Sequence, residues 1–253
     1  MNRNGYENNF KRRFGFLPEA CYIGFMKILL FDIDGTLIHS GGSGVHGMNL
    51  AFAGVWGIAD GLNGVPLSGR TDVLILQEAL ERHQLAWNEA KVARFKERYF
   101  IHLAEDMKQP RPARRLMAGF PELLEHLQKM AQVHVGLLTG NWRKSAEIKL
   151  AHFDLWKYFK FGAFADDESD RNKLVPHAIR RAQELYGITV ARDRVYVLGD
   201  TPRDVECARP HGAVAVAVAT GEYSFDDLRA HQPDYLFENF SEVEAVLRIV
   251  RQS

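Results

Sequence analysis

The sequence predicts an α/β fold, a doubly wound parallel sheet with helices on both faces, together with an inserted α-helical domain. Two observations predict the sheet. Short apolar runs of strand length recur along most of the chain, and segments with helical periodicity separate them. Such alternation is typical of parallel sheets covered by helices. A third observation predicts the insertion, because residues 44–115 hold no convincing strand but about three helical blocks.

The core elements follow in order from this pattern. Strands are expected where apolar and β-branched residues run together, at 27–32, 133–138, 161–164, 195–198, 213–218 and 234–237. Helices are expected between and after them, at 119–131, 142–152, 173–186, 202–209, 224–231 and 240–250. Ligands of such sheets bind beyond the carboxyl ends of the strands, so the residues that follow each strand carry the functional information.

The inserted block is predicted to be a helical cap with hinges at both ends. Its helices are expected near 44–57, 71–84 and 88–107. The block begins at the flexible segment Gly41-Gly42-Ser43-Gly44 and ends near the stiff segment Pro110-Arg111-Pro112. These segments are typical of hinges at the two ends of a lid. The domain prediction is therefore a core (26–43 and 116–253), a cap (44–115) and an N-terminal extension (1–25) that we expect to be disordered.

Composition excludes several classes of function. The 253 residues include 32 Lys and Arg against 32 Asp and Glu, so no global field favours nucleic acid or an anionic membrane. No apolar run approaches the length of a membrane span. The two cysteines, Cys21 and Cys207, cannot build a disulfide framework and fit a reducing compartment. We expect a cytoplasmic protein.

The most informative motif follows the first predicted strand. The apolar run ends in Asp32-Ile33-Asp34-Gly35-Thr36, and alternate side chains of a strand share a face, so Asp32 and Asp34 can point to the same side. Two acids in one small site are costly without a cation or a shared proton. A carboxylate can attack phosphorus, a second can transfer protons, and a divalent metal can neutralise both.

Three later motifs offer complementary chemistry. Thr139-Gly140-Asn141 ends the second predicted strand before a helix, where a hydroxyl and free amides can cradle phosphate. Lys173 opens a helix, an unfavourable place for a cation unless an anion lies nearby. Gly199-Asp200 ends a third apolar strand and supplies a further carboxylate for a hard cation such as Mg²⁺. A nucleophile, a hydroxyl, a cation and a metal-binding carboxylate together predict a phosphoryl-transfer site.

These motifs resemble those of the haloacid dehalogenase-like (HAD) hydrolase superfamily. The resemblance covers the chain from about Lys27 to its end, and the insertion lies where the helical caps of that family lie. Within it, the segment Leu67-Ser68-Gly69-Arg70-Thr71-Asp72 looks like the family's cap loop that approaches the substrate. Among subfamilies, the sequence looks most like phosphoglycolate-phosphatase-like members.

The resemblance implies a role for each motif residue. Asp32 would be the nucleophile that forms an aspartyl-phosphate, and Asp34 the general acid and base. Thr139 and Lys173 would bind phosphoryl oxygens, and Asp204 would orient metal-bound water or Lys173. Mg²⁺ would be held by Asp32, the Asp34 main-chain carbonyl and Asp200, while the remaining phosphate or substrate contacts would come from Gly35, Thr36, Gly140, Asn141 and Arg70.

One departure from the family pattern leaves the cation open. Many relatives have proline after the lysine of the third motif, whereas Leu174 follows Lys173 here. Arg171 lies two residues upstream and could supply the cation instead. We favour Lys173 on the sequence alone.

The expected activity is Mg²⁺-dependent hydrolysis of a small phosphorylated metabolite. Dehalogenating relatives lack an acid at the position of Asp34. A phosphomutase uses the same core, so it remains an alternative. A non-catalytic regulator that binds phosphate or a partner is the alternative from a different class, but such proteins usually lose a catalytic acid, and none is missing here.

Overall fold

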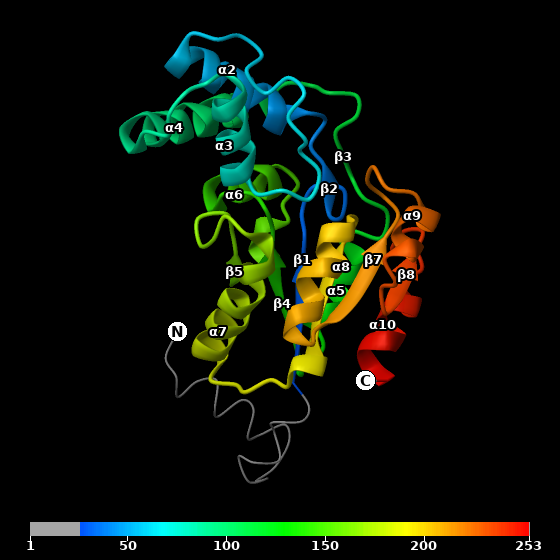
Figure 1. Ribbon diagram of the computed structural model, residues 1–253. Coiled ribbons are helices and arrows are strands. Elements are labelled where there is room, and N and C mark those ends of the chain that lie inside the picture. Colours follow the sequence, from blue (N-terminus) through cyan, green and yellow to red (C-terminus); the bar gives the residue numbers. More distant parts are fainter. Residues whose placement is uncertain (1–25, 253) are drawn as a thin grey trace.

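The computed structural model describes residues 26–252 and centres on a six-stranded parallel sheet of order β5-β4-β1-β6-β7-β8 (Figure 1). The strands are β1 (Lys27–Phe31), β4 (Val133–Leu138), β5 (Gly162–Ala163), β6 (Val195–Gly199), β7 (Val214–Val218) and β8 (Tyr235–Phe237). The predicted α/β fold and its six core strands are therefore confirmed. The N-terminal extension predicted for residues 1–25 lies outside the described residues.

Helices cover both faces of the sheet because its strands are apolar on both sides. Leu29 and Phe31 of β1 pack into one core with α5 (Glu122–Gln128), α6 (Arg143–His152) and α10 (Val243–Gln252). Ile28 and Leu30 pack into the opposite core with α7 (Leu174–Tyr186), α8 (Pro202–Ala208) and α9 (Phe225–Ala230). Burial on both faces fixes β1 in the middle of the sheet. Within residues 26–252, no helix has the length and apolar character that crossing a membrane requires.

Three further helices form the cap, with a hydrophobic core of its own. They are α2 (Ser43–Trp56), α3 (Asp72–Arg82) and α4 (Glu89–Asp106), and Figure 1 shows them beyond one end of the sheet. Phe52, Phe95 and Tyr99 are buried between them. Thr71 and Asn88 start α3 and α4 by accepting main-chain hydrogen bonds, as helix N-caps do.

A short two-stranded ribbon joins the cap to the core. Strand β2 (Ile38–His39) pairs antiparallel with β3 (Arg115–Leu116). The sequence suggested no strand between residues 32 and 133, and two-residue strands are too short to show a period-2 pattern. Arg114 connects the two ends of the cap. Its guanidinium donates to the Ser43 hydroxyl at the start of α2 and to the Met107 carbonyl after α4, both at 2.7 Å.

Candidate active site

The sheet order brings the predicted motifs to one edge. Strand β1 lies between β4 and β6, so the residues after these three strands meet at their shared carboxyl ends. Asp32 and Asp34 follow β1, Thr139 follows β4, and Asp200 follows β6. The chain leaves β1 toward β4 on one side and reaches β6 on the other, which is the topological switch point where open α/β sheets bind ligands.

Three buried carboxylates form an acidic cluster at this edge. One oxygen each from Asp32, Asp200 and Asp204 lies within 4.8 Å of the others. Thr36, a predicted phosphate contact, instead donates its hydroxyl to Asp200 at 2.9 Å. A Cβ added at Gly35 would come within 2.2 Å of an Asp200 oxygen, and one added at Gly221 within 1.7 Å. The two glycines therefore let the main chain close around the Asp200 carboxylate.

The acidic cluster has the charge pattern of a site for a divalent cation. Burial raises the pKa of Asp32, and the nearby Asp204 and Asp34 raise it further against the opposing effect of Arg171. Burial and the charges of Asp32 and Asp204 likewise raise the pKa of Asp200 well above its ordinary range. Carboxylate oxygens are the ligands that hard divalent cations prefer, and such an ion would remove this repulsion. The residues present therefore fit a divalent metal.

Arg171, and not Lys173, supplies the cation that lies against the acidic cluster. Arg171 is buried, with its guanidinium 3.1 Å from Asp32 and ion-paired with Asp204. Lys173 ends the same short 3₁₀ helix, η3 (Arg171–Lys173), but is exposed to solvent. The geometry therefore favours Arg171 over Lys173, and which of the two binds phosphate stays a prediction. Residues two apart in a helix lie on different faces, so only one of the two cations could point inward.

Asp204 orients this arginine rather than a lysine. Its carboxylate accepts hydrogen bonds from the Thr201 amide at 3.0 Å and the Thr201 hydroxyl at 2.7 Å, which forms a capping box at the start of α8. Its other oxygen contacts Arg171. A fixed carboxylate thus holds the guanidinium beside Asp32.

Asp34 has different surroundings. Lys149, from α6, donates to Asp34 at 2.6 Å and to the Asn141 side-chain oxygen at 2.6 Å. Asn141 donates to Asp34 at 3.0 Å and to the Thr139 hydroxyl at 2.8 Å. Desolvation would raise the pKa of Asp34, but Lys149 and Asn141 hold it below its ordinary value. Asn141 therefore links the first two motifs instead of facing open solvent.

Lys149 is not among the site residues that the sequence predicts. A signal was available, because Ala146, Lys149 and Leu150 share one face of α6 and the other two are fully buried. A lysine on an apolar helix face needs a buried anionic partner. Which acid would be that partner could not be read from the pattern, since Asp34 lies 115 positions away.

The cap loop is seated on the core beside these residues. The Asp72 amide donates to the Gly140 carbonyl at 2.7 Å, and the Asp72 carboxylate accepts from the Trp142 amide at 2.8 Å. A Cβ at Gly140 would lie 2.1 Å from the Arg70 carbonyl, so only glycine permits this approach. Gly140 thus packs against the cap loop, which lies over the second motif.

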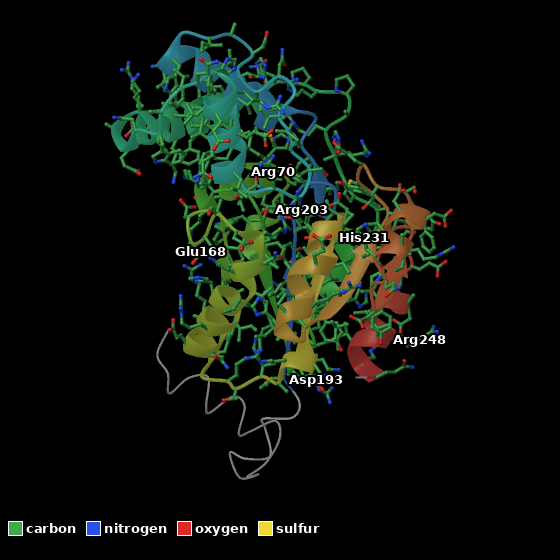
Figure 2. All side chains as sticks on the ribbon, viewed as in Figure 1. Arg70, Glu168, Asp193, Arg203, His231 and Arg248 are labelled. Carbon is green, nitrogen blue, oxygen red and sulfur yellow. The ribbon has the colours of Figure 1, made fainter. Side chains whose placement is uncertain are left out.

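Arg70 does not offer the free cation that the sequence suggested. Its guanidinium is ion-paired with Glu78 in the cap and is largely buried. Figure 2 shows Arg70 and Arg203 at the junction of cap and core, where Gly69 packs closely against the Arg203 side chain. Because Glu78 also pairs with Arg82, the two arginines share one carboxylate.

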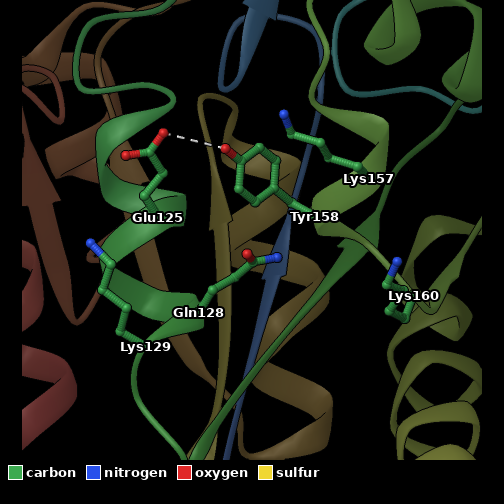
Figure 3. A pocket seen from close by; sticks show the side chains of 6 residues that line it. All are labelled: Glu125, Gln128, Lys129, Lys157, Tyr158 and Lys160. Carbon is green, nitrogen blue, oxygen red and sulfur yellow. Dashed lines mark hydrogen bonds between the residues drawn. The ribbon is translucent and has the colours of Figure 1, made fainter.

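A surface hollow lies elsewhere on the molecule. It measures about 630 Å³ and is lined by Glu125, Gln128, Lys129, Lys157, Tyr158 and Lys160 (Figure 3). These residues come from the α5 segment and from the region around the 3₁₀ helix η2 (Trp156–Tyr158), and none belongs to a predicted motif. The strand-end cluster, not this hollow, carries the candidate chemistry.

Comparison with known proteins agrees with the arrangement. The family model described as haloacid dehalogenase-like hydrolase matches residues 29–209. A protein assigned as pyrophosphatase PpaX in Caldanaerobacter subterraneus is 26% identical over 88% of this chain and 96% of its own length. A phosphoglycolate phosphatase of Synechococcus elongatus is 31% identical over 56% of this chain and 64% of its own length.

A solved structure shows the same fold. It is assigned as a β-phosphoglucomutase from Bacteroides vulgatus and superposes with a TM-score of 0.63 at 18% identity. The alignment covers 98% of this chain and 96% of that one. At this identity the likeness concerns the fold alone.

Proposed function

The chain belongs to the haloacid dehalogenase-like hydrolase family, and from this premise we propose that it is a Mg²⁺-dependent phosphatase of a small phosphorylated metabolite. The enzyme is a hydrolase acting on phosphoric monoesters. The observation that carries the proposal is the pairing of two acids after β1 with separate cations. Asp32 contacts Arg171, and Asp34 contacts Lys149.

In the proposed reaction Asp32 attacks phosphorus. An oxygen–phosphorus bond forms to its carboxylate while the bond to the ester oxygen breaks, and Asp34 gives a proton to the leaving oxygen. In the second half, Asp34 takes a proton from water, whose oxygen attacks phosphorus and displaces Asp32. The products are an alcohol and inorganic phosphate, and both carboxyl groups return to their starting state.

The transferred phosphoryl group is held by side chains from neighbouring loops. Arg171 is already 3.1 Å from Asp32, so it can also reach an oxygen of a phosphoryl group at that carboxylate. The Thr139 hydroxyl accepts from Asn141, which leaves its proton for a phosphoryl oxygen. We assign Arg171 the role that the family pattern suggested for Lys173.

Asp32, Asp200 and the Asp34 main-chain carbonyl would hold Mg²⁺. When bound, the ion supplies positive charge against the negative charge of phosphoryl transfer. The chain's own contribution is to keep Asp200 in place through Thr36 and the close approach of Gly35. The oxygen-only donor set favours a hard divalent ion, and Mg²⁺ is the ion that the family resemblance implies.

The names of the relatives suggest the first substrates to try. One relative is a phosphoglycolate phosphatase and another is assigned as a pyrophosphatase, so both compounds belong in a substrate panel. Arg70 stays a candidate contact for a second anionic group, because it shares the single Glu78 carboxylate with Arg82. We place the activity in the cytoplasm, as the composition suggests.

The test is phosphate release from phosphoglycolate, sugar phosphates, pyrophosphate and p-nitrophenyl phosphate, with and without Mg²⁺. Asp32→Asn changes one oxygen and little volume, so we expect it to fold and to lose at least about 10⁴-fold in turnover, as nucleophile variants do. Thermal unfolding of the variant serves as the control for folding. Turnover equal to that of the wild type would rule out Asp32 as the nucleophile.

The phosphomutase alternative is tested in the same assay. The fold is shared with a protein assigned as a β-phosphoglucomutase, which makes this second outcome specific. A mutase would convert a hexose 1-phosphate to its 6-phosphate with little free phosphate, whereas a phosphatase releases phosphate. Binding of phosphate without either reaction would instead favour the non-catalytic regulator.

A further inference from the structure

Lys149 is an unusual residue for the position it occupies. It lies near the end of α6 and only 4% of its surface is exposed, although lysine is almost never buried without a partner. An ammonium removed from water must be compensated by hydrogen bonds to anionic or strongly polar groups. The groups that surround the Lys149 ammonium therefore indicate its role.

The ammonium of Lys149 has two short hydrogen bonds within the site. It lies 2.6 Å from an Asp34 carboxylate oxygen and 2.6 Å from the Asn141 side-chain oxygen. The Asn141 amide donates to the same Asp34 oxygen at 3.0 Å. Two donors from the segment after β4 thus converge on one oxygen of Asp34, and one of them is charged.

Exposure separates the roles of the two residues. The Asp34 side chain keeps 40% of its surface open, whereas the Lys149 side chain keeps 6%. A substrate that enters the site can therefore reach Asp34, but Lys149 lies behind it. Lys149 therefore acts on the reaction through the residues that its ammonium contacts, Asp34 and Asn141.

The cap covers Lys149 from above. A Cβ added at Gly44, in the first turn of α2, would lie 3.3 Å from the Lys149 ammonium and 3.6 Å from the adjacent carbon. The first separation is tighter than an ordinary contact, so a Cβ at position 44 would require the lysine to move by a few tenths of an ångström. The place of the ammonium thus depends on a glycine of the cap as well as on two residues of the core.

We propose that Lys149 is a positioning residue that fixes the Asp34 carboxylate and stabilises the negative charge that develops on it as its proton passes to the leaving group. The inference rests on the proposed function, in which Asp34 is the general acid. A fixed positive charge behind the proton donor helps most when the leaving oxygen is strongly basic, because proton transfer is then most advanced in the transition state. The effect should therefore depend on the leaving group.

The test compares kcat/KM for two esters in the full-length protein with Mg²⁺. Glycerol phosphate has a basic alkoxide leaving group, and p-nitrophenyl phosphate has a weakly basic one. For Lys149→Met we expect a loss of about 10- to 100-fold with glycerol phosphate, typical of a misplaced catalytic group, and of less than about threefold with p-nitrophenyl phosphate. Lys144→Met, in an exposed lysine of the same helix, should match the wild type with both esters.

A double variant shows whether Lys149 acts through Asp34. If it does, Asp34→Asn combined with Lys149→Met should be no slower than Asp34→Asn alone, because the group that Lys149 acts on is already gone. Multiplicative losses in the double variant would overturn the proposal. Equal losses with the two esters in Lys149→Met would also overturn it, since a merely structural role does not distinguish leaving groups.

A glycine variant tests the same idea without removing the charge. Gly44→Ala should displace the Lys149 ammonium by a few tenths of an ångström and lower kcat/KM for glycerol phosphate more than for p-nitrophenyl phosphate. Gly54→Ala is the matched control in the same helix, where an added Cβ meets the flexible Arg98 side chain instead. Wild-type rates in Gly44→Ala would contradict the inference that catalysis depends on the position of the Lys149 ammonium. A wild-type protein inactive toward every ester would overturn the proposed function, and this inference with it.

Discussion

The surroundings of Asp32 and Asp34 differ, although the two acids are separated by one residue and follow the same strand. Asp32 is 5% exposed and shares its cluster with two other acids and Arg171. Asp34 is partly open and bonds Lys149 and Asn141. The pKa of Asp32 is raised by burial and neighbouring acids, whereas Lys149 and Asn141 lower that of Asp34.

The difference separates two tasks. On the Asp32 side, repulsion between buried acids favours a bound cation and a reaction that spreads negative charge over several donors. On the Asp34 side, a single ion pair holds one proton-transferring group in a defined place. The two carboxyls thus lie in different electrostatic environments, and a divalent cation at the acidic cluster would lower the pKa of Asp32 and favour its ionised, nucleophilic form.

We expect the largest effect from a substitution that removes the metal from the Asp32 side. Asp200→Asn should lower Mg²⁺-dependent turnover by more than about 10³-fold, because charge stabilisation is the main source of phosphoryl-transfer catalysis. Without Mg²⁺ the variant should unfold at a higher temperature than the wild type, since it lacks one buried acid. Mg²⁺ at about 100 times its Kd should stabilise only the wild type, by about 2.7 kcal/mol.

Calorimetry with and without Mg²⁺ measures both parts of this prediction. Asp193 is an exposed acid outside the cluster. The control variant Asp193→Asn should therefore respond to Mg²⁺ as the wild type does. If Mg²⁺ stabilised Asp200→Asn as strongly as the wild type, the acidic cluster would not be the metal site. A bound cation would then no longer explain why the surroundings of Asp32 and Asp34 differ.

A smaller effect distinguishes the two candidate cations. Arg171→Met should reduce kcat by about 10²- to 10³-fold, as the loss of a donor to developing charge does. The same change should destabilise the fold by about 3–5 kcal/mol, because it leaves buried acids unpaired. Arg171→Lys keeps the charge without the fork geometry and should retain more activity than Arg171→Met.

Lys173→Met completes that comparison. Lys173 is exposed, so the variant should stay within about twofold of the wild type. Steady-state kinetics on all three variants under saturating Mg²⁺ would decide between the cations. A large loss in Lys173→Met combined with near-normal activity in Arg171→Lys would restore the lysine to the third motif.

The smallest effect concerns the cap residue next to the Asp34 side. Burial raises the pKa of Asp72 from 3.8 to about 6, although Lys149 and hydrogen bonds from Trp142 and Ser145 oppose the shift and Asp34 adds to it. Between these two pH values the folded chain keeps a proton that the unfolded chain has lost. The free energy of unfolding therefore falls as pH rises from about 4 to 6.

Asp72→Asn removes this titration and keeps an oxygen that can accept the same hydrogen bonds. Relative to the wild type, the variant should gain stability as pH rises from about 4 to 6, and the difference should stay constant above about pH 7. Turnover should remain within about fivefold, because only the charge of one hydrogen-bond acceptor changes. Urea unfolding at several pH values measures the difference, and a flat profile would show that folding does not shift the pKa of Asp72.

The sequence alone determined the fold and most of the motif residues. Continuous apolar runs located the six core strands, which are buried on both faces, and helical periodicity located the cap helices. Asp32, Asp34, Thr139 and Asp200 were found because the end of a parallel strand is a position that can be read from sequence. Strand order then brings such ends together whatever lies between them.

Only the tertiary structure decided the partners. Lys173 and Arg171 are two residues apart, and which of them faces the acids depends on the turn of η3. The pairing of Lys149 with Asp34, the pairing of Arg70 with Glu78, and the ribbon of β2 and β3 each depend on where separate segments meet. Side-chain charge is visible in a sequence, but its neighbours and its exposure to water are properties of the packed chain, and these set what each charge does.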